Sequence, residues 1–171
     1  MSTEIRTKQK LQPGDGLVVR SFCISSEGGS DMLYRNCAGG VVFSGSKVLL
    51  LKNEKGEWVL PKGHVEEGES RREVARERVM REAKVESRVL GVAGETEYEF
   101  YSSTRKKPVC NQVVWYVMEA RDAVCTPNAR EGFEDGGFFD KDDALTRVSY
   151  TQDRALVAQA YLILEKMREE M

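Results

Sequence analysis

The sequence predicts an α/β domain in which a mixed β-sheet carries helices on its faces. Strand-like and helix-like segments alternate along the chain, an order typical of this fold class. Short turns join some of the strand-like segments as hairpins, so part of the sheet is expected to be antiparallel. The 171 residues are enough for one domain of ordinary size with its own core.

Composition excludes several classes of protein. With 40% hydrophobic and 32% charged residues, the chain is expected to be globular. A net charge of −2 provides no overall attraction to nucleic acid or to an anionic membrane, and no apolar run is long enough to span a membrane. The polar N-terminus, MSTEIRTKQK, and four widely spaced cysteines favour a cytoplasmic protein with reduced thiols. His64 is the single histidine, which argues against zinc.

The N-terminal part divides into an extension and the start of the main domain. Residues 1–34 are expected to be an added strand or a tail, with a glycine-containing flexible loop at 25–31. Residues 35–171 form the main domain. The strands expected in the first third are bounded by turn residues, and they are 17–22, 38–43, 48–52 and 58–62.

A helix is expected over residues 71–84. Val74, Ala75 and Val79 recur at helical spacing, and Ser70 stands where an N-cap belongs. The elements expected after this helix are strands at 89–94, 95–102 and 109–120, a short strand ending the acidic segment 131–140, a helical turn at 142–145 and a final helix at 153–170.

The segment GHVEEGE and the helix after it resemble the Nudix box, whose signature is GX5EX7REUXEEXGU with U a bulky aliphatic residue. The positions that match, counted from Gly63, are Gly63, Glu69, Val79, Glu82 and Val85. The departures are Glu77, Arg78, Arg81 and Lys84, which replace arginine, two glutamates and glycine. WVLPKGHVEEGE, GETEYEFY and VVWYVMEA are similar to the branch of diadenosine tetraphosphate hydrolases and diphosphoinositol polyphosphate phosphohydrolases, and the resemblance covers roughly residues 35–165.

This resemblance implies a Nudix α/β/α sandwich that hydrolyses nucleoside diphosphate-linked or dinucleoside polyphosphate substrates with Mg2+. The implied partner is a nucleotide or polyphosphate small molecule, with nucleic acid expected only as a capped 5′ end. The implied catalytic residues are Glu69 and Glu82, and the implied metal ligands are Glu69, Glu82 and Glu131. The implied phosphate-binding residues are Lys62, Gly63 and His64, and a domain that binds phosphate without metal would add Arg78 and Arg81 as direct phosphate partners.

The two arginines oppose the implied metal chemistry. Three box glutamates would carry a charge of −3, whereas Arg78, Arg81 and Glu82 together carry +1. Each arginine near the site opposes a cation by at least about 1 kcal/mol. Arg78 lies four residues before Glu82 and is expected to pair with it along the helix. Hydrolysis is therefore expected to be weak or lost. The alternative function is a non-catalytic phosphate-binding module that needs no metal.

Several residues keep two interpretations. Glu69 is either a metal ligand or a cap of its loop. Lys62 either binds phosphate or is solvated, and His64 either contacts phosphate or makes a hydrogen bond within the loop. A displaced metal could draw on an acid of the later loop, namely Glu131, Glu134 or Asp135. The aromatic residues expected to form core or to stack a nucleobase are Tyr98, Phe100, Tyr101, Trp115 and Tyr116. Residues 105–107 form a basic cluster that either grips polyphosphate or lies at a solvated hairpin tip.

Overall fold

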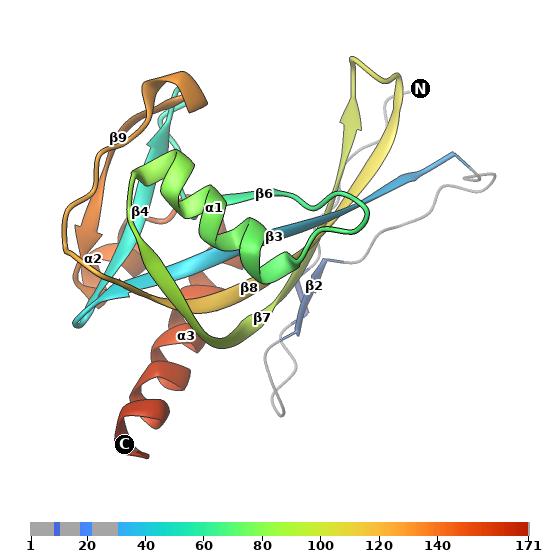
Figure 1. Cartoon of the computed structure of the whole chain (residues 1–171). Helices are drawn as coiled ribbons and strands as arrows, with labels where there is room; N and C mark the ends of the chain where they lie inside the picture. The colour runs from blue at the N-terminus through green and yellow to red at the C-terminus, as the bar shows by residue number, and fades with distance from the viewer. Residues whose placement is uncertain (1–8, 11–17, 22–30, 171) are drawn as a thin grey trace.

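The computed structural model describes residues 9–10, 18–21 and 31–170, so most of the loop expected at 25–31 lies outside the described residues. These residues build one curled sheet with helices on both faces (Figure 1). The strands follow one another across the sheet in the order β1 (Gln9–Lys10), β2 (Val18–Ser21), β7 (Ser87–Ser102), β8 (Lys107–Ala120), β3 (Leu33–Ser44), β4 (Lys47–Asn53) and β5 (Trp58–Val59). Two more strands join from the side, with β6 (Lys62–His64) paired to β3 and β9 (Phe133–Phe139) paired to β4.

The sheet is mixed, as the sequence predicts. β3 and β8 run parallel over a long register, from Leu33 opposite Val109 to Phe43 opposite Glu119. β7 and β8 form an antiparallel hairpin, and so do β3 and β4. β2 lies parallel to β7, so residues that precede position 35 extend the same sheet.

The helices divide between the two faces of the sheet. α1 (Arg71–Ala83) covers one face, whereas α2 (Lys141–Arg147) and α3 (Thr151–Glu169) cover the other (Figure 1). Each face has its own apolar core: Val79 of α1 packs with Ala38 and Met118, and Leu156 of α3 packs with Val41 and Val117. The α/β sandwich predicted from the sequence is confirmed.

The start of α1 confirms the helix predicted over 71–84. The Glu73 backbone N–H donates to Ser70 Oγ at 3.5 Å, so Ser70 is the N-cap. The helix ends at Ala83, and Lys84 follows in the left-handed conformation with φ 55°. Lys84 occupies the position where the resemblance expects glycine, the residue that adopts this conformation without strain.

Two strand predictions were wrong. Residues 89–94 and 95–102 form one strand, β7, because β-bulges between Val89 and Gly91 and between Val92 and Gly94 bend the strand without ending it. Residues 58–62 do not form one strand. Trp58 and Val59 pair with β4, whereas the chain from Lys62 onwards pairs with β3. Pro61 lies between the two paired segments. Proline lacks the N–H that a continuous ladder needs.

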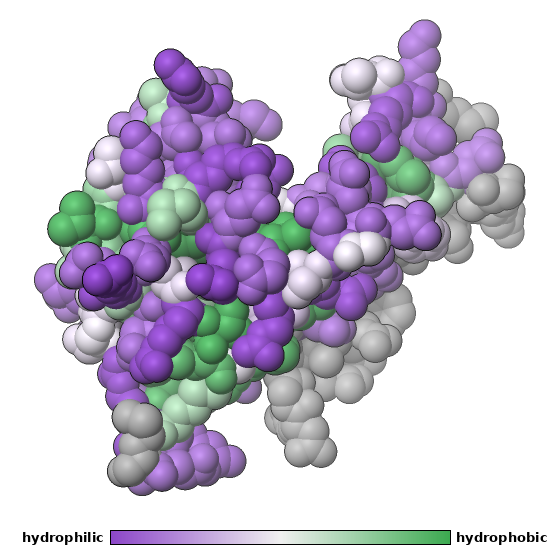
Figure 2. All heavy atoms as spheres, in the orientation of Figure 1, coloured by the Kyte–Doolittle hydropathy of each residue, from purple (hydrophilic) through white to green (hydrophobic). Residues whose placement is uncertain are grey.

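The face of the molecule seen in Figure 2 is mostly hydrophilic, with apolar areas between the polar side chains. A notch separates the projecting β7–β8 hairpin from the part of the molecule that carries α1 and β9 (Figure 2). Among the described residues, no helix combines the length and apolar character that crossing a membrane requires.

Candidate functional site

The loop that leads into α1 is held by β6 and by its own side chains. β6 pairs antiparallel with β3, placing Gly63 opposite Ala38. Glu69 Oε1 accepts a hydrogen bond from the Glu66 backbone N–H at 2.9 Å, which closes the loop before Ser70. Glu69 therefore makes the loop-capping contact that the sequence left open as one of its two interpretations. An open hollow of about 620 Å³ runs beside this loop, bordered by Asn36, Tyr116 and residues 65–72.

Glu82 lies on the buried side of α1. Its side chain is 6% exposed, and Oε2 has no hydrogen-bond partner among the described residues. Burial raises the pKa of Glu82 to about 8, although the Arg78 charge and a backbone hydrogen bond from Lys62 act to lower it. The Glu131 charge adds to the rise. Burial thus makes this carboxyl hold a proton more strongly than an exposed glutamate does.

Arg78 crosses from α1 to β6. A methyl group added at Gly63 would overlap Nε, Cγ and Cδ of Arg78, so the arginine side chain lies directly against the glycine backbone. Its Nη1 is 3.7 Å from Glu131 Oε2. The ion pair expected between Arg78 and Glu82 is thus replaced by an ion pair between Arg78 and Glu131. The charge of Arg78 still acts to lower the pKa of Glu82. Arg78, Gly63, Glu82 and Glu131 are brought together.

Arg81 lies on a different side of the helix. Its guanidinium pairs with Glu77 one turn earlier, and the side chain remains 43% exposed. Its carbonyl accepts a hydrogen bond from Asn128 Nδ2 at 2.8 Å. The two box arginines, which the sequence treats as one group, therefore have separate environments.

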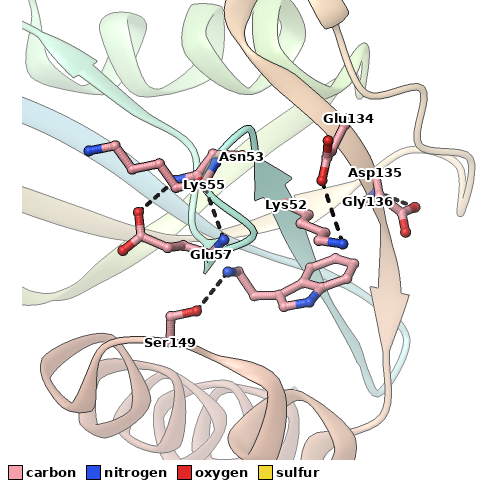
Figure 3. A network of polar contacts seen from close by, with 9 residues as sticks. Lys52, Asn53, Lys55, Glu57, Glu134, Asp135, Gly136 and Ser149 are labelled. Carbon is pink, nitrogen blue, oxygen red and sulfur yellow. Dashed lines mark hydrogen bonds and ion pairs between the residues drawn. The ribbon is translucent and has the colours of Figure 1, made fainter.

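The other acids of the later loop are engaged with neighbouring residues (Figure 3). Glu134 pairs with Lys52 at 3.5 Å, which joins β9 to β4. Asp135 Oδ1 accepts a hydrogen bond from the Gly136 backbone at 2.7 Å. Glu131 is the member of this segment that reaches the box helix.

A second polar cluster lies on the face of the sheet that carries α3. Lys62 Nζ donates to Tyr98 Oη at 2.8 Å and lies 4.3 Å from the centre of the Tyr98 ring. Asn111 Nδ2 also donates to Tyr98 Oη at 2.8 Å, while the buried Oδ1 of Asn111 has no partner within the described part of the chain. Lys62 is therefore tied to a strand that is distant in sequence, and is not a solvated loop lysine.

Asp153 at the start of α3 completes this cluster. Burial raises the pKa of Asp153 to about 6, against the opposing charge of Lys62. Burial also acts to lower the pKa of Lys62, but Tyr98 and Asp153 outweigh it, so the pKa is raised. Asn111 and Asp153 were missed from the sequence. The signal for Asn111 was the β7–β8 hairpin register, which places it opposite Tyr98.

Positive charge gathers where β3 meets β6. Burial raises the pKa of the Cys37 thiol, while three cations, Lys62, Arg35 and Arg78, act to lower it. Arg35 Nε is buried and lacks a hydrogen-bond partner among residues 31–170. His64 lies directly opposite Cys37 on β6. The region can therefore attract an anion.

The comparisons with known proteins agree with this architecture. The NUDIX domain model matches residues 33–160. An ADP-ribose pyrophosphatase from Streptococcus suis has a TM-score of 0.58 at 18% identity, covering 75% of this chain and 90% of that chain. A C. elegans Ap4A hydrolase has a TM-score of 0.59 at 18% identity, covering 77% of this chain and 98% of that one. Likeness at this identity shows the fold alone.

The curled mixed sheet, its flanking helices and the loop–helix box after β6 define an α/β sandwich of the kind that these solved structures share. The family model spans well over half of the chain, and the chain belongs to the NUDIX family.

NUDIX enzymes generally use a divalent metal ion, and the residues present here do not fit one. Mg2+ requires several oxygen ligands in near-octahedral geometry. Within the described ranges, no group of three or more histidine, cysteine, aspartate or glutamate side chains is arranged to hold a metal ion. Glu82 is buried, Glu131 pairs with Arg78, and Glu69 bonds its own loop. The cation at this place is a guanidinium.

Proposed function

We propose that this NUDIX domain binds a nucleoside diphosphate-linked or dinucleoside polyphosphate ligand without metal and without hydrolysing it. The observation that carries this proposal is the position of Arg78, which lies on Gly63 between Glu82 and Glu131. Arginine provides planar donors that match phosphate oxygens, so it can neutralise a phosphate directly.

The charge around β6 supports a phosphate ligand. Arg35, Lys62 and Arg78 all act on Cys37, so their charges converge on one short stretch of the sheet. β6 pairs with β3, and no pairing on its other edge is seen among the described residues. A diphosphate lying along that edge would meet Arg78 on one side and Lys62 on the other.

The polar cluster beside α3 supports recognition of the nucleoside part. Asn111 Oδ1 is an unused acceptor, which suits an exocyclic amine or a ribose hydroxyl. The rings of Tyr98 and Phe100 stack with centroids 6.1 Å apart and form an aromatic wall on the same strand. The ligand class is that of the resembling branch, whose solved relatives include an Ap4A hydrolase.

Hydrolysis requires an activated water, and Arg78 and Arg81 stand at two of the positions where box glutamates would hold the activating metal. A bound metal lowers the pKa of water and stabilises the charge that develops on phosphate. Glu82, which holds the last glutamate position of the box, is buried, and burial raises its pKa to about 8.

The second candidate function is a hydrolase with a displaced metal. The feature that favours it is the open hollow beside the box loop, whose lining residues include Glu66, Glu67 and Glu69. This candidate predicts ligand turnover that depends on added metal.

Calorimetric titration with ADP-ribose and Ap4A, in EDTA and in Mg2+, separates the two functions. We expect equal affinity in both buffers and no product from these compounds or from capped RNA. Arg35→Gln should weaken binding roughly tenfold, because it removes one charge-assisted contact. Arg88→Gln is the matched control, since Arg88 pairs with Glu119 at the surface with its side chain 72% exposed. Metal-dependent turnover that Glu82→Gln abolishes would establish the hydrolase instead.

A further inference from the structure

We infer that Arg78 is the resident cation of the box, fixed by Gly63 and Glu131, and that its guanidinium excludes a divalent ion from this place. Arg78 has this role whichever ligand the domain binds. Arg81 does not share the role, although both arginines replace glutamates of the box signature.

Gly63 provides the space in which Arg78 lies. The Arg78 side chain occupies the volume that any larger residue at position 63 would take. Gly63 is also buried and paired to Ala38 of β3, so the strand cannot easily move away. The contact involves Cγ, Cδ and the guanidinium Nε of Arg78, while Nη1 of the same guanidinium lies 3.7 Å from Glu131 Oε2.

Glu131 is held in place by a segment fastened to the end of α1. The Thr126 backbone N–H donates to the Ala83 carbonyl at 2.8 Å, and the Asn128 N–H donates to the Glu82 carbonyl at 2.9 Å. Asn128 also caps the short helix η1 (Ala129–Glu131) by accepting from the Arg130 N–H at 3.1 Å. These bonds fix the segment independently of any metal, so Arg78 meets a positioned carboxylate.

Two components of a metal site are thus engaged by one side chain. Arg78 pairs with Glu131 and fills the space at the Gly63 backbone. A divalent ion here would lie within a few ångströms of a fixed positive charge and would have to displace it. Arg81 does not oppose a divalent ion in this way, because its charge is balanced by Glu77 on the outer side of the helix.

Mn2+ binding measured by electron paramagnetic resonance tests this inference without requiring ligand or activity. We expect the wild-type chain to leave millimolar Mn2+ free. Arg78→Glu should gain Mn2+ affinity by at least about tenfold, because it removes the positive charge and adds a carboxylate. Arg76→Glu makes the same charge change on α1 at a residue that pairs with Glu73, and it should gain nothing comparable. If Arg78→Glu does not fold, Arg78→Gln provides the readout, with a smaller gain.

A double-mutant cycle tests the contact between Arg78 and Gly63. Gly63→Ala should lower the melting temperature of the wild-type chain and lower it clearly less in the Arg78→Ala background, where the overlapping side chain is gone. Equal effects in both backgrounds would contradict the role of Gly63. Wild-type Mn2+ binding as tight as that of Arg78→Glu would overturn the inference, even if ADP-ribose binding proved metal-independent.

Discussion

Charged residues of the same type behave differently in this protein because their surroundings differ. Arg78 and Arg81 are three positions apart, yet one lies against a buried strand and the other forms a surface pair. Glu82 and Asp153 are both acids whose pKa burial raises, one beneath each face of the sheet. For these residues, location decides whether the group is charged and therefore what it can bind.

Asp153 gives a pH dependence at this scale. Its pKa rises from 3.8 to about 6 on folding, so the folded chain binds more protons than the unfolded chain between these values. Stability from this group is fully present below about pH 4 and is lost as pH rises towards 6. The loss amounts to at most about 3 kcal/mol. Asp153→Asn should remove this dependence. Urea unfolding across this range measures it, and parallel curves for both proteins would contradict it.

At the scale of elements, close approach at β3 positions the box. Gly39 of β3 pairs with Lys62 of β6 on one side and with Trp115 of β8 on the other. A methyl group at Gly39 would be 2.6 Å from the Pro61 carbonyl oxygen and would meet the Trp115 ring. Trp115 is fixed by donating to Thr96 at 2.8 Å across the β7–β8 pair. Small residues in β3 therefore let β6 lie against the sheet with Gly63 facing Arg78.

Gly39→Ala is expected to destabilise the protein by about 1–3 kcal/mol, because backbone and a fixed ring must move to accept the methyl group. Gly137→Ala in β9 is the control, since its new methyl group would make an ordinary contact with Phe139 at 3.8 Å. Urea denaturation of both variants measures the difference. Equal stability of the two variants would show that β6 can shift without cost.

At the scale of the whole molecule, the sheet separates two apolar cores that have different structural roles. The core beneath α1 positions the box, whereas the core beneath α2 and α3 provides most of the large buried side chains. Leu156 on α3 is fully buried and lies in the second core. Changes there should affect the stability of the domain while leaving the arrangement around Arg78 intact.

Leu156→Ala should lower the free energy of unfolding by about 2–5 kcal/mol through lost burial and an internal cavity. Leu162→Ala on the same helix should change it by less than about 0.5 kcal/mol, because Leu162 is 58% exposed. Chemical denaturation gives both values. Folded Leu156→Ala should still leave Mn2+ unbound, and new metal binding in it would show that the two cores are coupled.

Much of the fold could be predicted because its signals are local. The spacing of Val74, Ala75 and Val79 and the capping hydroxyl of Ser70 act within one helix, and both predictions were confirmed. The strands at 58–62 and 89–102 were harder. Bulges and a change of pairing partner depend on neighbouring strands, which sequence periodicity does not specify.

The sequence by itself determined the α/β sandwich, the helix that begins after Ser70 and the presence of arginine at positions 78 and 81. Only the tertiary structure decided that Arg78 turns to Gly63 and Glu131, that Arg81 turns to Glu77, and that Lys62 joins Tyr98. Local propensity acts over a few residues, whereas these contacts join segments that only the folded sheet brings together. Electrostatic interaction depends on distance and burial, and neither can be read from sequence spacing alone.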